Sequence, residues 1–107
     1  MLTNKYKTKL SNTHCLGMIS IIEHLVSGTK NAAPEQLLHL AALAEVMQRI
    51  KVKLINYSKV YKITFTPAQA LAIHALFVEY ISPHNKTTGD LYNRIMQMSN
   101  EIHQLYQ

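Results

Sequence analysis

The most apolar stretch of the chain is residues 68–81, AQALAIHALFVEYI, in which the strongly polar residues are Gln69, His74 and Glu79. On a helix these three side chains point to about 0°, 140° and 280° around the axis, so the segment has no polar face. A helix that is apolar on every side is expected to be buried on every side. It is also too short to span a bilayer. We therefore expect this helix at the centre of a bundle, or with one face against another chain.

Helical spacing of apolar residues predicts a helix over 12–27 and a longer one over 34–60. Ser11, Asn12 and Thr13 offer N-caps for the first helix, and Pro34 suits the first turn of the second. The second helix carries an apolar seam whose steps alternate between three and four residues, which is typical of a packing seam. The members of this seam are Leu40, Leu43, Met47, Ile50, Leu54, Tyr57 and Tyr61.

Two segments fit both the helical and the extended period. In residues 1–10, lysines alternate with less polar residues as in a strand, while Leu2, Tyr6 and Leu10 also fit a helix. In residues 59–65, alternate residues are again apolar, although the helical seam continues to Tyr61. The second helix is therefore expected to end between residues 57 and 61, and residues 1–10 are a tail, an arm or the first turns of a helix.

A third helix is predicted over 67–81, with Thr66 at its cap and Pro67 at its first position. A fourth is predicted over 88–106, and its apolar seam consists of Leu91, Ile95, Met98, Ile102 and Leu105. Short connections between helices favour antiparallel neighbours. The sequence thus predicts one all-α domain over 1–107, an up-down four-helix bundle with a central, nearly all-apolar third helix.

Composition indicates a globular protein in a reducing compartment. The chain of 107 residues is 48% hydrophobic and 16% charged, and its single cysteine permits no intrachain disulfide. The lysines before the apolar run 15–22 suggest a secretion signal, but Glu23 and His24 interrupt that run and no cleavage site follows. No apolar run is long enough for a transmembrane helix. We therefore expect a cytoplasmic protein that does not enter membranes.

Catalytic and metal-binding patterns do not occur in the sequence. The six histidines include no pair at helical i, i+3 or i, i+4 spacing, and there is no Glu-x-x-His motif. The six acidic residues are scattered, and no glycine-rich phosphate loop is present. His14 and Cys15 are adjacent on a helix and so do not face each other. We expect no enzymatic activity, no cofactor, no metal and no small-molecule substrate.

His74 and Cys15 are expected to be structural. A neutral imidazole inside an apolar helix needs a hydrogen-bond partner, for which a backbone carbonyl or a hydroxyl suffices. Cys15 lies on an apolar stripe and is expected to pack as a small core residue.

The missing polar face of the third helix favours a non-enzymatic protein–protein interaction module that self-associates as a homodimer. A self-complementary apolar patch is the usual cause of a symmetric dimer. The predicted interface consists of Leu71, Ile73, His74, Leu76, Phe77 and Tyr80.

The alternative is a small basic nucleic-acid-binding protein, since the net charge is +5. Its predicted contacts open the fourth helix and are Lys86, Thr88, Tyr92, Asn93 and Arg94. A second basic segment, residues 49–62, contains no acid. We expect its charges to spread over the outer face of the second helix, and Tyr57 and Tyr61 to pack in the seam rather than stack on bases.

Overall fold

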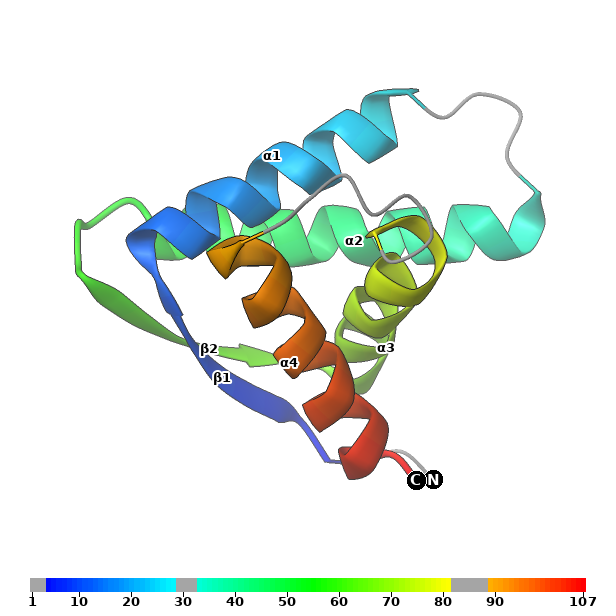
Figure 1. Cartoon of the computed structure of the whole chain (residues 1–107). Helices are drawn as coiled ribbons and strands as arrows, with labels where there is room; N and C mark the ends of the chain where they lie inside the picture. Colours follow the sequence, from blue (N-terminus) through cyan, green and yellow to red (C-terminus); the bar gives the residue numbers. More distant parts are fainter. Residues whose placement is uncertain (1–3, 29–32, 82–88) are drawn as a thin grey trace.

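The computed structural model describes residues 4–28, 33–81 and 89–107. The chain forms four α-helices, a π-helical turn and two strands within these residues (Figure 1). The elements are β1 Tyr6–Ser11, α1 Asn12–Gly28, α2 Pro34–Lys53, β2 Val60–Phe65, α3 Pro67–Ala75, η1 Leu76–Ile81 and α4 Asp90–Leu105.

The prediction of an all-α four-helix bundle is wrong, because the two segments of ambiguous period form strands. β1 and β2 pair as a two-stranded antiparallel sheet, and α2 ends at Lys53 instead of continuing to residue 60. Residues 60–65 are mostly β-branched or aromatic, which favours a strand. Pairing with β1 then supplies the backbone hydrogen bonds that an extended segment needs.

The other three predicted helices are present with similar bounds. α1 covers Asn12–Gly28 against the predicted 12–27, and α3 with η1 covers the predicted 67–81. α4 begins at Asp90, and the predicted start at residue 88 lies outside the described residues. The predicted cap of α3 is confirmed: Thr66 Oγ1 accepts a hydrogen bond from the Gln69 amide, while Gln69 Oε1 accepts one from the Thr66 amide.

The β1–β2 ribbon has one buried face and one exposed face. Buried side chains alternate with exposed or half-buried ones along both strands, and the buried set consists of Tyr6, Thr8, Leu10, Tyr61, Ile63 and Phe65. An isolated two-stranded hairpin is only marginally stable in water. The ribbon is held because its inner face belongs to the same core cluster as the helices.

The helices pack in sequence order, α1 on α2, α2 on α3 and α3 on α4. In Figure 1, α1 and α2 run side by side, and the ribbon extends from them along α4 towards the C-terminal end. Polar contacts fasten the ribbon to α4. Arg94 donates to Thr8 Oγ1 at 2.6 Å and to the Lys9 carbonyl oxygen at 2.9 Å, and the Tyr6 hydroxyl donates to Glu101.

The apolar α3–η1 segment is largely covered by its own chain. Its fully buried residues include Ile73 and Leu76, which are 0% and 1% exposed. Phe77 contacts Tyr92 of α4, with ring centroids 5.5 Å apart. Ala68, Val78 and Glu79 are the exposed residues of the segment. The segment therefore needs no second chain to bury most of its apolar surface.

Candidate functional site

The predicted interface residues on α3 and η1 do not form an open surface. Ile73 and Leu76 are buried, and Leu71, His74, Phe77 and Tyr80 are half-buried. His74 has the hydrogen-bond partner that its setting required: its Nδ1 lies 2.7 Å from the Ser99 hydroxyl and 3.2 Å from the Ser99 carbonyl oxygen.

The predicted nucleic-acid contacts on the fourth helix are not brought together either. Lys86 and Thr88 lie outside the described residues. Arg94 is occupied by its hydrogen bonds to β1, and Tyr92 is packed against Phe77. Asn93 is exposed, but it is the only one of the three described residues with a free side chain.

The fold instead places two acid-free stretches of the sequence next to each other. Residues 1–22 and 46–78 contain no Asp or Glu, and together they hold eight of the 11 Lys and Arg residues. These eight are Lys5, Lys7, Lys9, Arg49, Lys51, Lys53, Lys59 and Lys62. β1 comes from the first stretch and β2 from the second, so the ribbon joins them. The pairing therefore brings lysines from both stretches onto one ribbon.

The exposed face of the ribbon carries opposed lysines. Lys9 is directly opposite Lys62, and Lys7 is opposite Thr64. The Asn12 amide donates to the Lys59 carbonyl oxygen, so the alternation of the ladder makes Lys9–Lys62 a non-hydrogen-bonded pair, in which side chains approach most closely. Like charges directly opposite each other destabilise a sheet.

No acidic side chain among the described residues neutralises these lysines. Among the described residues no carboxylate lies within ion-pair distance of Lys7, Lys9 or Lys62, and the ion pair that does form joins His14 to Asp90. Lys7, Lys9, Lys62 and Thr64 also line a depression of about 300 Å³ on the ribbon. We call this exposed face, defined by Lys7, Lys9, Lys62 and Thr64, the lysine face.

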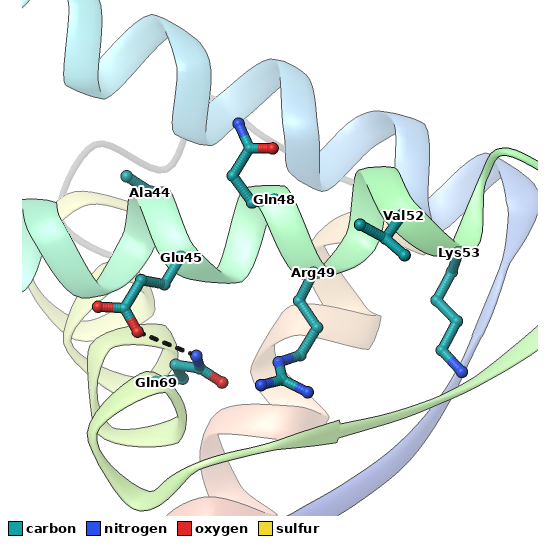
Figure 2. Close-up of a pocket in the computed structure, with 7 residues that line it drawn as sticks. All are labelled: Ala44, Glu45, Gln48, Arg49, Val52, Lys53 and Gln69. Atoms are coloured by element: carbon teal, nitrogen blue, oxygen red, sulfur yellow. Dashed lines mark hydrogen bonds between the residues drawn. The ribbon is translucent and has the colours of Figure 1, made fainter.

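A second hollow lies beside the C-terminal half of α2, with a volume of about 610 Å³. Its lining residues are Ala44, Glu45, Gln48, Arg49, Val52, Lys53 and Gln69. Figure 2 shows the side chains of Arg49 and Lys53 extending from α2 to the side on which β2 runs. The one acid in this hollow, Glu45, accepts a hydrogen bond from Gln69 Nε2 at 3.1 Å. Arg49 and Lys53 therefore extend the positive surface from the ribbon to α2.

The tyrosines of the basic segment differ from the prediction that both pack. Tyr61 is buried on β2, but Tyr57 lies in the connection between α2 and β2 and is 77% exposed. The helical period of the sequence placed both in one seam, and that seam ends with the helix at Lys53. An exposed aromatic residue among lysines is therefore a feature that sequence reasoning missed.

A metal site, a reactive thiol and a membrane span are the other features considered for the sequence. The described residues include no group of three or more His, Cys, Asp or Glu side chains arranged to hold a metal ion. Cys15 is completely buried, and burial raises the pKa of its thiol to about 11, so the thiol is not activated. None of the described helices combines the length and apolar character that crossing a membrane requires.

Comparisons with known proteins add no assignment. Protein-family models give no match, and curated proteins and solved structures give no significant match. The chemistry of the lysine face and its surroundings is therefore the basis for a functional proposal.

Proposed function

We propose that this protein binds nucleic acid through the lysine face of the β1–β2 ribbon. The observation that carries the proposal is the opposition of Lys9 and Lys62 on an exposed surface without a neighbouring carboxylate among the described residues. Such a pair weakens the ribbon when the protein is alone. A chain of phosphates between the two ammonium groups removes that repulsion and releases condensed counterions, which is the main source of affinity in nucleic-acid binding.

The basic residues around the lysine face also favour nucleic acid as the partner. Lys5, Lys53, Lys59 and Arg49 are exposed near the two strands or on α2, and Lys and Arg are the residues that contact phosphate oxygens. Contacts between lysines and phosphates fix the position of the nucleic-acid backbone and do not distinguish one base from another. We therefore expect affinity with little dependence on sequence.

The proposal is tested by measuring the affinity of fluorescein-labelled oligonucleotides by anisotropy between about 50 and 200 mM salt. Each phosphate neutralised contributes about −0.7 to −0.9 to the slope of log K against log salt. A variant with Lys9→Gln and Lys62→Gln is expected to bind more weakly and to lower the magnitude of the slope by about 1.4 to 1.8.

A matched control separates this surface from the total charge. Asn100 and Gln104 are exposed on α4, and changing both to Glu also lowers the net charge by two. We expect this control to keep the salt slope of the wild type. Equal weakening by the two variants, or no binding by the wild type at about 50 mM salt, would contradict the proposal.

Self-association through α3 and η1 is the second candidate, since the half-buried Leu71, Phe77 and Tyr80 and the exposed Val78 leave part of its apolar surface open. Light-scattering mass on a size-exclusion column, over a tenfold range of concentration, tests it. A constant mass near twice 12.2 kDa that Val78→Glu reduces to the monomer would favour this candidate. Val78 is chosen because it is exposed beside these residues.

A further inference from the structure

The connection between α2 and β2 carries an exposed aromatic side chain on a backbone that hydrogen bonds hold in place. Tyr57 is 77% exposed, and within the described residues its side chain has no hydrogen-bond or ring partner. An exposed tyrosine does not stabilise the fold through burial. Its backbone neighbours are nevertheless held firmly.

A single buried hydroxyl fastens the backbone on both sides of Tyr57. The Tyr61 hydroxyl accepts a hydrogen bond from the Ser58 amide at 2.8 Å and donates one to the Asn56 carbonyl oxygen at 3.2 Å. Asn12 Nδ2 of α1 donates to the same hydroxyl at 3.3 Å. The Ser58 hydroxyl donates to the Val60 carbonyl oxygen at 2.8 Å. The residues before and after Tyr57 are thus tied to the core, and the ring projects from a preorganised turn.

The surroundings of Tyr57 combine positive charge with exposed apolar surface. Lys53 and Lys59 are exposed on either side of it in the chain. Val52, Ile55 and Val60 are also exposed, on the last turn of α2, in the connection and at the start of β2. A partner that offers negative charge and a flat apolar face at the same place would contact both kinds of residue. An unpaired nucleotide has both, a phosphate and an exposed base.

We propose that the nucleic acid bound by this protein is single-stranded and that Tyr57 stacks on one of its bases. This inference rests on the proposed function and adds the class of nucleic acid. In a duplex the bases already stack on each other, so only a single strand presents a base face to the ring. The phosphates on either side of that base then reach Lys59 and the lysine face of the ribbon.

The first test compares a fifteen-nucleotide oligothymidine with a duplex of the same length. Tyr57→Ala is expected to weaken binding of the single strand roughly fivefold to hundredfold, the range for loss of one base–aromatic stack, and to leave duplex binding unchanged. Tyr57→Phe retains the ring and is expected to bind as the wild type does. The salt slope is expected to stay constant in Tyr57→Ala, because no charge is lost. The Tyr57 side chain is exposed, so the variant is expected to fold normally.

The second test uses the absence of tryptophan from the chain. Tyr57→Trp introduces a single tryptophan, and stacking on a base is expected to quench its fluorescence on addition of oligothymidine. Leu38→Trp is the control, because Leu38 is 73% exposed in the N-terminal half of α2. Its fluorescence is expected to remain unchanged.

The outcomes distinguish this inference from the proposed function. Wild-type affinity in Tyr57→Ala, or equal affinity for both forms of DNA without quenching, would overturn the inference and leave nucleic-acid binding intact. If neither form binds and the fluorescence of the Tyr57→Trp variant responds instead to phosphatidylserine vesicles, both proposals are wrong and the surface binds an anionic membrane.

Discussion

Reversing one charge of the Lys9–Lys62 pair is expected to stabilise the protein while it weakens nucleic-acid binding. In Lys9→Glu the repulsion across the ribbon becomes an attraction. Two unit charges about 6 Å apart in water interact by about 0.7 kcal/mol, so the change from repulsion to attraction amounts to about 1.4 kcal/mol. Screening at physiological salt roughly halves this value. The expected gain is therefore about 0.5–1 kcal/mol, or a rise in Tm of roughly 2–6 °C.

The assay is thermal unfolding followed by circular dichroism at low salt and at about 1 M salt. Lys7→Glu is the matched control, since Lys7 is on the same strand and face but lies opposite Thr64. Its Tm is expected to rise less than that of Lys9→Glu. The double variant with Lys9→Glu and Lys62→Glu recreates a like-charged pair and is expected to lose the gain. In the high-salt condition the differences are expected to vanish, because the Debye length is then about 3 Å.

An unchanged or lower Tm for Lys9→Glu at low salt would refute the close opposition of the two lysines. A gain that persists at high salt would refute its electrostatic origin. The combination of higher stability and weaker binding is informative because a general loss of folding cannot produce it.

Three further predictions concern the contacts that hold the ribbon and the core. Tyr61→Phe removes the hydroxyl that fastens the α2–β2 connection and is expected to lower the free energy of unfolding in urea by about 1–3 kcal/mol, since it leaves polar groups without partners; an unchanged midpoint would contradict the proposed anchor. Arg94→Met removes the hydrogen bonds to Thr8 and to the Lys9 carbonyl oxygen. Relative to the wild type, amide hydrogen exchange is expected to accelerate more in β1 than in α2. The pKa of Cys15 is raised by burial to about 11 and that of Tyr6 is raised by burial and by Glu101, so the folded state binds these protons more tightly than the unfolded state. Stability is therefore expected to be unaffected below about pH 8 and to fall above it, and Cys15→Ala is expected to lose less stability between about pH 8 and pH 10; parallel losses would contradict this assignment.

Local chemistry accounts for the parts of the fold that were predicted correctly. The Thr66–Pro67 start of α3 depends on atoms within three residues of each other, Thr66 and Gln69. The same is true of the start of α1, where the Ser11 hydroxyl accepts a hydrogen bond from the His14 amide at 3.1 Å. Such contacts form within a few residues whatever the rest of the chain does, and the sequence alone predicts them.

The ribbon could not be predicted in the same way, because its partners are far apart in the sequence. Tyr6 pairs with Phe65 and Ser11 with Val60, and Tyr61 satisfies both the helical and the extended period. Which period applies depends on whether residues 6–11 are available as a pairing strand. The prediction therefore extended the second helix too far and placed Tyr57 in its packed seam.

Local signals in the sequence predict the helices with clear caps, the apolar residues of the core and the two stretches without acidic residues. Only the folded chain shows that these stretches pair, that Lys9 and Lys62 lie opposite each other, and that Tyr57 is exposed while Tyr61 is buried. The physical reason is that periodicity and capping act over a few residues, whereas a surface is made by backbone pairing between distant segments. The proposed binding site consists of residues from β1, α2 and β2 and exists only once that pairing has formed.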